Sequence, residues 1–316
     1  MPMKIKIVFF GSSEFSARIL EALHKIYEIP LVITQPDKPV GRKKILQSTP
    51  VAVLADRLKI PLIKPGSLRK QPEVFTKIQD AAPDLFVVVA YGKIIPDELL
   101  QIPKKGPINI HGSILPKYRG AAPIQGALAA GASETGITIM LMDAEMDHGP
   151  VLSTANLAIG PDETFEQLES RLATLAEQLI LKTIPEFLSG KITPIEQNHS
   201  QATFTKIISR EDGAIDWKKT AAEIYNQYRA FHAWPGIWTI WQNQTLKINK
   251  CRVEAPQPAD KKTAAPGEVL TFDGRLLVQT GQGLLEIEEL QLEGKNRAVA
   301  REFLNGHRSL IGSILG

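Results

Sequence analysis

The feature that most constrains the fold is the opening stretch IKIVFFG, residues 5–11, a continuous apolar run that ends in glycine. Such a run is typical of a strand buried on both faces in a parallel sheet, with the glycine at the start of a turn. Apolar residues then recur at helical spacing over residues 15–26. A strand followed at once by a helix predicts that the chain begins an α/β fold.

The same alternation continues beyond the first helix. Apolar runs at residues 29–34 and 84–90 predict two more strands, and residues 50–58 and 71–80 show helical spacing. Right-handed crossovers between such strands give an open, Rossmann-like, mostly parallel sheet. The first turn carries one glycine, Gly11, where a dinucleotide fingerprint needs three, and no Walker A lysine follows a glycine run. The sequence therefore disfavours NAD and ATP as ligands.

Composition narrows the class of protein. The chain has 316 residues, which fits two domains, and 37 Lys and Arg against 34 Asp and Glu give a net charge of +3. A polyanion would therefore be met by a local patch of charge. Cys251 is the single cysteine, and the six histidines lack metal-ligand spacing, so we expect no disulfide and no metal. Without a signal-peptide pattern or a membrane-spanning run, the chain is expected to be cytoplasmic.

A basic segment, QPDKPVGRKKILQ at residues 35–47, lies between the second strand and the next helix. Two prolines and a glycine argue against a regular element, and long loops in compact folds are often functional. Its basic residues are Lys38, Arg42, Lys43 and Lys44. Such a cluster suits the phosphates of a nucleic acid, although a solvated loop without a partner explains it equally well.

Two polar residues stand at the end of a short apolar strand in the stretch PINIHGSILPKYRG, residues 107–120. Asn109 and His111 are two residues apart, so they project to the same face of that strand. Open α/β sheets bind ligands beyond the carboxyl ends of their strands. An amide and an imidazole at such a place are suited to act on a carbonyl carbon.

A carboxylate is expected to join them. Residues 136–142 predict another strand, and the loop after it carries three carboxylates. If the two strands are neighbours, one of these groups can orient His111 or favour its protonated form. Asp147 lies at the turn of the loop, whereas Asp143 follows the strand directly, so Asp147 is the better candidate. His148 comes next in the chain and can compete with His111 for it.

The second half of the chain predicts a different architecture. Residues 164–188 form a long helical pattern, and the polar, aperiodic stretch 190–207 follows as a linker. We therefore expect one domain at 1–189 and another at 208–316. After a helix at 221–231, short strands separated by turns fit a small β-barrel. The expected strands are residues 237–242, 245–253, 267–272, 275–280 and 283–292.

Taken together, these segments resemble a known family. Asn109-x-His111-Gly-Ser-x-Leu-Pro-x-Tyr-Arg-Gly is followed by Ala-Ala-Pro-Ile-Gln at 121–125, Glu-Thr-Gly-x-Thr at 134–138 and Met-Asp-x-Gly-Pro at 146–150. Over nearly the whole chain, this combination resembles the methionyl-tRNA formyltransferase family. The first segment is shared with other formyltransferases that use 10-formyltetrahydrofolate. The Ala-Ala-Pro-Ile-Gln run and the second domain are more selective.

The resemblance implies a fold, a reaction and its participants. Members transfer a formyl group from 10-formyltetrahydrofolate to the α-amine of methionyl-initiator tRNA, for translation initiation, and need no metal. Their fold is the formyltransferase sheet followed by a tRNA-binding β-barrel of the OB type. A monomer that binds these two substrates is the expected form.

The resemblance also implies roles for particular residues. Asn109 and a protonated His111 would stabilise charge on the formyl oxygen, while Asp147 would orient His111 and help to move the proton of the amine. Arg42 would engage the acceptor end of the tRNA, and its basic neighbours Lys38, Lys43 and Lys44 are expected to bind tRNA with it through their charge. The folate would lie beside Tyr91, Gly92, Lys93 and Ile94 and beside Ser113, Ile114, Leu115 and Pro116.

Three alternatives differ in what the same residues do. A hydrolase would use the three polar residues to deliver water and release formate. A sugar-amine or glycinamide ribonucleotide formyltransferase would change only the acceptor. A non-enzymatic RNA-binding protein would leave the three residues idle and use the basic loop and the barrel. In that barrel we expect Trp234, Trp238 and Trp241 to pack in the core rather than to stack on bases.

Overall fold

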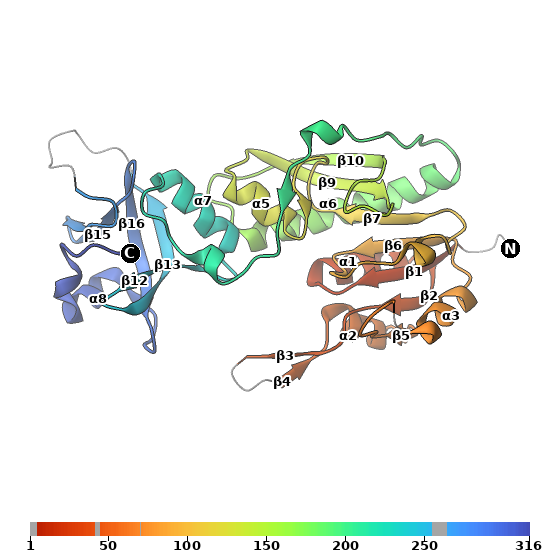
Figure 1. The fold of residues 1–316 in the computed structure, drawn as a ribbon, viewed down its shortest axis with the longest axis horizontal. Coiled ribbons are helices and arrows are strands. Elements are labelled where there is room, and N and C mark those ends of the chain that lie inside the picture. The colour runs from red at the N-terminus through yellow and green to blue at the C-terminus, as the bar shows by residue number, and fades with distance from the viewer. Residues whose placement is uncertain (1–4, 42–44, 70, 255–263) are drawn as a thin grey trace. The chain divides into compact units, whose positions relative to one another are not determined.

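The computed structural model describes residues 5–41, 45–69, 71–254 and 264–316, which form two compact units (Figure 1). The first unit comprises Met1–Pro123, Glu134–Ala158 and Glu169–Lys206. The second comprises Ile124–Ser133, Ile159–Leu168 and Ile207–Gly316. Two short segments that precede residue 169 thus belong to the second unit. The assignment of residues 1–189, 190–207 and 208–316 as catalytic domain, linker and tRNA-binding domain stays a prediction.

The first unit is built on a seven-stranded sheet. Its strands in spatial order are β10 (Val151–Ala158), β9 (Glu134–Leu141), β7 (Pro107–His111), β6 (Leu85–Val89), β1 (Lys6–Gly11), β2 (Glu28–Ile33) and β5 (Leu62–Ile63). Strands from β7 to β5 are parallel, and β9 is antiparallel to both its neighbours. The helices of this unit are α1 (Glu14–His24), α2 (Pro50–Arg57), α3 (Pro72–Asp80), α4 (Asp97–Leu100) and most of α6 (Phe165–Leu188), whereas α5 (Pro123–Ala129) belongs to the second unit apart from Pro123. The predicted open, mostly parallel sheet is confirmed.

Helices cover both faces of the central strands, which explains their uninterrupted apolar sequences. Val8 and Phe10 of β1 pack in one cluster with Val74 and Ile78 of α3. The alternate residues of β1 point to the opposite face and are equally buried, and α1 packs against β1 and β6. A strand buried on both faces gains about 25 cal/mol per Å² of apolar surface removed from water.

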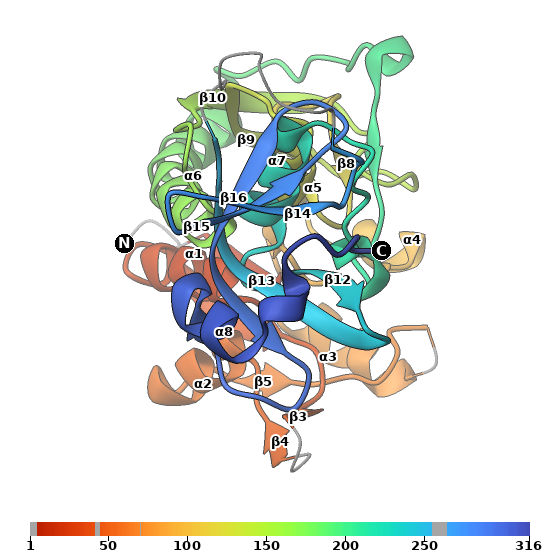
Figure 2. The ribbon, with the colours of Figure 1, turned by 90° about the vertical axis from the view of Figure 1, so that its left-hand side faces the viewer.

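The second unit contains a six-stranded antiparallel sheet. Its strands are β12 (Ile237–Trp241), β13 (Gln244–Val253), β14 (Val269–Phe272), β15 (Arg275–Gln279), β16 (Leu284–Leu292) and β17 (Ala298–Val299). Short 3-10 turns, η2 (Glu211–Gly213) and η3 (Arg308–Leu310), accompany helices α7 (Ala221–Phe231) and α8 (Ala300–Gly306). Helix α8 packs beside β15 and β16 (Figure 2). The predicted small β domain is confirmed.

Strands β12 and β14 are the edges of this sheet, and the segment 312–316 hydrogen-bonds to both. Ile240 and Gly316 exchange backbone hydrogen bonds of 2.8 and 3.2 Å. On the other edge, the N–H of Val269 donates to the carbonyl of Ser313 over 2.9 Å. In the described ranges β12 and β14 do not pair with each other, so this segment, not strand pairing, bridges the edges.

The basic segment contains regular structure, so the expectation of an irregular loop is wrong. Strands β3 (Lys38–Val40) and β4 (Ile45–Gln47) pair as an antiparallel hairpin. Pro39 is tolerated because a two-stranded ribbon leaves one side of each strand without a neighbour, where a missing N–H costs nothing. Lys38 is exposed on this hairpin, whereas Arg42, Lys43 and Lys44 lie outside the described residues.

The tryptophan expectation is correct for one of the three residues and not for another. Trp241 is buried in the core of the second unit, whereas Trp234 is exposed. Trp238 is half-buried, and its indole N–H donates to the carbonyl of Arg210 over 3.1 Å.

Cys251 is buried, and burial raises the pKa of its thiol. In the described ranges no helix has the length and apolar character needed to cross a bilayer.

The core of the second unit generates a stability prediction. Leu290 is fully buried there, so Leu290→Ala leaves a cavity and is expected to lower the free energy of unfolding by roughly 2–5 kcal/mol. Val299 is 52 % exposed, so Val299→Ala should change it by no more than about 0.5 kcal/mol. All four tryptophans belong to this unit, so urea unfolding followed by tryptophan fluorescence measures both. Equal losses in the two variants would contradict this account of the core.

Candidate active site

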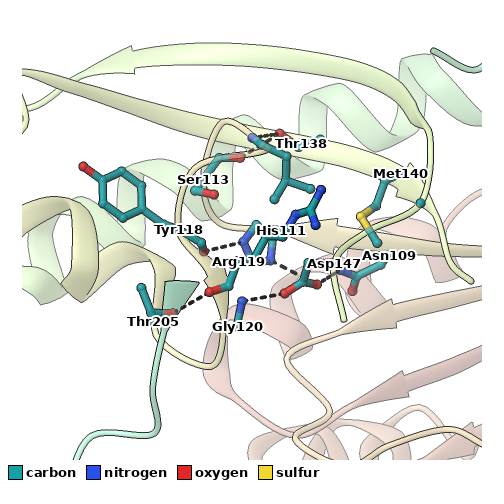
Figure 3. Close-up of polar contacts among 12 residues, drawn as sticks. Asn109, His111, Ser113, Tyr118, Arg119, Gly120, Thr138, Met140, Asp147 and Thr205 are labelled. Atoms are coloured by element: carbon teal, nitrogen blue, oxygen red, sulfur yellow. Dashed lines mark hydrogen bonds and ion pairs between the residues drawn. The ribbon is translucent and has the colours of Figure 1, made fainter. Parts of the chain in front are cut away.

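Three side chains singled out from the sequence converge in the first unit (Figure 3). Asn109 and His111 project from the same face of β7, and Asp147 comes from the loop between β9 and β10. Asp147 Oδ1 accepts a hydrogen bond from Asn109 Nδ2 over 3.3 Å and lies 3.5 Å from His111 Nδ1. Because β7 and β9 are neighbours, the loop that follows β9 returns beside β7. An amide, an imidazole and a carboxylate thus share one small volume.

The ring of His111 lies between two hydrogen-bond acceptors. Its Nε2 is 3.0 Å from the carbonyl oxygen of Tyr118, and since a carbonyl only accepts, Nε2 carries the proton of that bond. Its Nδ1 faces the carboxylate of Asp147. Only the doubly protonated ring donates to both partners. The side chains of His111 and Asp147 are 6 % and 13 % exposed, so little water screens their interaction.

The second oxygen of Asp147 is held by a backbone group. Oδ2 accepts a hydrogen bond of 2.7 Å from the N–H of Gly120, in the short strand β8 (Arg119–Gly120). Gly120 has a φ of +105°, and a Cβ atom there would lie 2.3 Å from the carbonyl oxygen of Thr205. Backbone conformation and close approach therefore both require glycine at this position.

The predicted folate segment that follows β7 is fixed by Thr138 of β9. The hydroxyl of Thr138 donates to the carbonyl of Ser113 over 2.7 Å and accepts from the N–H of Leu115 over 3.0 Å. Ser113 and Leu115 are buried, and the Leu115–Pro116 peptide is cis. Ile114 and Pro116 are half-buried. Surface for a ligand in this segment therefore comes from Ile114 and Pro116.

The other predicted folate segment follows β6. Tyr91 is buried, and burial raises the pKa of its hydroxyl to about 12. Its carbonyl oxygen accepts a hydrogen bond of 2.6 Å from Gln35 Nε2, next to Gly92 at a φ of +73°. The ammonium of Lys93 donates to two backbone carbonyls over 2.8 Å each. Ile94 is 79 % exposed, so it is the member of this segment with free apolar surface.

His148 does not compete with His111 for Asp147 in this structure. Its Nδ1 donates to Asp143 Oδ2 over 2.7 Å, and its ring stacks on that of His199 with centroids 4.0 Å apart. Asp143 is thereby engaged away from the cluster. In the described part of the chain, no group of three or more His, Cys, Asp and Glu side chains is arranged to hold a metal ion.

Sequence reasoning missed three groups that hold the cluster. Two are the carbonyl of Tyr118 and the N–H of Gly120, which are backbone atoms and have no side-chain signature. The third is Gln197, whose Nε2 donates to the carbonyls of Asp147 and Gly149 over 3.0 and 2.7 Å. Gly120 itself was the one signal available in the sequence, because glycine is favoured where the backbone requires a positive φ.

Comparison with known proteins defines the class. Residues 3–184 match the family described as formyl transferase, and residues 207–308 match the formyl transferase C-terminal domain. The fold is shared with an N-formyltransferase from Helicobacter canadensis, solved with folinic acid and dTDP-3-aminofucose. That structure has a TM-score of 0.66 and 20% sequence identity over 90% of this chain and 98% of its own. The chain belongs to the formyl transferase family.

Relatives that match over their full length show to which group within this family the chain belongs. The methionyl-tRNA formyltransferase of Desulforamulus reducens is 41% identical over 314 residues, 99% of this chain and 98% of its own length. That of Geobacter sulfurreducens is 42% identical over 315 residues, 99% and 97% of the two chains. Within the family, the chain belongs with the methionyl-tRNA formyltransferases.

The contact between Gly120 and Asp147 generates a prediction. In Gly120→Ala the new methyl group meets the backbone of Thr205, so the N–H that holds Asp147 must move. Displacements of about 1 Å at a reacting centre cost roughly 100-fold in rate, and we expect a loss in kcat of that order. Gly190→Ala is the matched control, because Gly190 has a φ of +73° but no neighbour within 4 Å. Equal kcat values in the two variants would contradict the role of this contact.

Proposed function

We propose that this protein transfers the formyl group of 10-formyltetrahydrofolate to the α-amine of methionyl-initiator tRNA, for translation initiation. The observation that carries the proposal is the convergence of Asn109, His111 and Asp147 at one end of the sheet. The chain that presents them is about 40% identical to methionyl-tRNA formyltransferases over nearly its whole length. The acceptor and the donor of the reaction are taken from that relationship.

The reaction exchanges one carbon–nitrogen bond for another. The neutral α-amine of methionine attacks the formyl carbon, an amide bond forms, and the bond between that carbon and N10 of the folate breaks. The amine loses one proton and N10 gains one, so the protons balance. Negative charge builds on the formyl oxygen during the attack, and the protein must stabilise it.

Asn109 supplies a donor for that charge. Its amide has two N–H groups, and the contact with Asp147 uses one of them. The second is available to the formyl oxygen. A donor aimed at a developing oxyanion typically contributes about 3–4 kcal/mol to transition-state stabilisation.

His111 and Asp147 act as a pair. The proton on His111 Nε2, now bonded to Tyr118, is shared with a formyl oxygen that approaches the same nitrogen. Asp147 orients the ring and takes the proton that the amine loses, directly or through a water molecule. Its two oxygens already have three neighbours, so its position is fixed before the substrates arrive.

The segments after β6 and β7 fit the folate as apolar walls. Ile94, Ile114 and Pro116 offer apolar surface, which suits the flat pterin ring of the formyl donor. Tyr91, Ser113 and Leu115 are buried, so their role is to shape these segments. Gly92 and Lys93 complete the first of the two walls.

The hairpin and the second unit are the proposed tRNA-binding parts. Lys38, Arg42, Lys43 and Lys44 supply four positive charges for phosphates of the acceptor end. The domain at 208–316 carries the barrel-like sheet and binds the body of the tRNA. We propose that the enzyme acts in the cytoplasm as a monomer, since both substrate sites belong to one chain.

The first test is the reaction itself. With 10-formyltetrahydrofolate and methionyl-initiator tRNA, the protein should block the methionine amine, as measured by resistance of the product to aminopeptidase. His111→Ala and Asn109→Ala should each lower kcat by about 100–1,000-fold, because each removes a donor from the formyl oxygen. Transfer to a nucleotide-linked amino sugar, or release of formate without tRNA, would reject the assignment. Unchanged activity of His111→Ala would reject the catalytic role of the cluster.

A second test addresses the hairpin. Arg42→Ala should raise KM for the tRNA about tenfold while KM for the folate stays unchanged, and it should flatten the fall in affinity with salt, because one phosphate contact is lost. Lys182 is an exposed cation on α6, and Lys182→Ala serves as the control. If the two variants bind tRNA equally well, the hairpin is not the acceptor-end contact.

A further inference from the structure

The stretch interpreted from the sequence as a linker is attached to the catalytic unit at both of its ends. We call residues 195–205 the strap. At one end, Ile195 and Val151 exchange backbone hydrogen bonds of 2.8 and 2.9 Å. At the other end, β11 (Phe204–Thr205) pairs in parallel with β8. The strap therefore runs between the loop that carries Asp147 and the loop that donates to it.

Gln197 of the strap holds the turn that presents Asp147. It is 7 % exposed, and its Nε2 donates to the carbonyls of both Asp147 and Gly149. Asp147 has a φ of +51°, a conformation that residues with a side chain adopt only when their surroundings support it. Gly149 has no room for a side chain, since a Cβ atom would lie 2.1 Å from the carbonyl oxygen of Leu141. One amide group thus fixes both sides of a crowded turn.

Arg119 fixes the orientation of that amide. Its Nη2 donates to Gln197 Oε1 over 2.7 Å and to His199 Nδ1 over 2.8 Å. A guanidinium group has only donors, so the atom of Gln197 that faces it must be the oxygen. The nitrogen of Gln197 is then directed to the two carbonyls of the turn. Arg119 belongs to β8, so this contact also links the two loops.

Two threonines of the strap hold the loop of residues 118–122, which contains β8. The hydroxyl of Thr205 donates to the carbonyl of Arg119 over 3.0 Å (Figure 3). It also accepts a hydrogen bond from the N–H of Ala122 over 3.1 Å. The hydroxyl of Thr203 accepts from the N–H of Tyr118 over 2.8 Å. These bonds lie on both sides of two backbone groups of the site. One is the carbonyl of Tyr118, which accepts from His111 Nε2, and the other is the N–H of Gly120, which donates to Asp147.

We propose that Gln197 and Thr205 are positioning residues for the reaction. Gln197 fixes the backbone that carries the carboxylate of Asp147, and Thr205 fixes the loop that donates to that carboxylate. Neither side chain belongs to the cluster of Asn109, His111 and Asp147, so both act through Asp147. This inference rests on the proposed function, because the reaction that Gln197 and Thr205 would accelerate is formyl transfer. The contacts of the two side chains do not depend on which substrate binds.

The central variant is Gln197→Ala. It should lower kcat for formyl transfer by about 10–100-fold and leave KM for the folate and for the tRNA unchanged, because only the alignment of Asp147 is lost. In an Asp147→Asn background the same change should lower kcat by less than about threefold, since residues that act as a unit are not additive. Gln201 lies on the same strap and is exposed, so Gln201→Ala is the matched control and should retain the wild-type kcat.

Thr205 supplies a second, independent pair of variants. Thr205→Val keeps the shape of the side chain and removes its hydroxyl, so kcat should fall by about tenfold. Thr205→Ser restores the hydroxyl and should recover most of that loss. If Gln197→Ala fails to fold, this pair tests the proposal alone. A Thr205→Val variant with the wild-type kcat, or with a loss that Thr205→Ser does not recover, would overturn it.

A spectroscopic measurement separates this inference from the proposed function. The Cε1–H resonance of His111 in a ¹H–¹³C spectrum reports the carboxylate beside its ring. It should move in Gln197→Ala in the same direction as in Asp147→Asn, and stay in place in Gln201→Ala. If it moves as expected while the wild-type protein fails to formylate the tRNA, the proposed function fails and the positioning role stands. If it stays in place in Gln197→Ala, the positioning role is wrong, whatever the enzyme's activity.

Discussion

The carboxylate of Asp147 is the point at which the active-site loops meet. One oxygen contacts Asn109 and His111 from β7, and the other accepts the N–H of Gly120. A largely buried carboxylate is stable only when its lone pairs are satisfied, and here donors from two separate segments approach both oxygens. The same contacts that stabilise the charge also fix its position, so the structural and the chemical requirements of this site coincide.

The sheet explains why these segments meet. In an open α/β sheet the loops at the carboxyl ends of parallel strands lie along one edge, and β7 contributes Asn109 and His111 close to that edge. The reversal of β9 against β7 then places the loop that follows β9 at the far end of the pair, where its turn folds back beside Asn109.

The sequence predicted those parts that depend on side-chain pattern. The apolar runs located the central strands, and the period of two placed Asn109 and His111 on one face. Strand β10 was not predicted, because the edge strand VLSTANLA mostly alternates half-buried and exposed residues and lacks a continuous apolar run. Gln197 was not predicted either, since it lies 50 residues beyond Asp147 in a stretch without periodicity. Its role depends on backbone carbonyls, which every residue has.

The most direct test of the central claim is the single-turnover rate of formyl transfer by Asp147→Asn with both substrates saturating. Asparagine keeps the size of the side chain, but it removes the charge beside His111 and brings an N–H donor toward the amide of Asn109. We predict a rate lower by about 100–1,000-fold, with unchanged dissociation constants for the folate and the tRNA. A single-turnover rate within a few-fold of the wild type would contradict the account, because the cluster would then be a structural feature of the sheet and the chemistry would lie elsewhere.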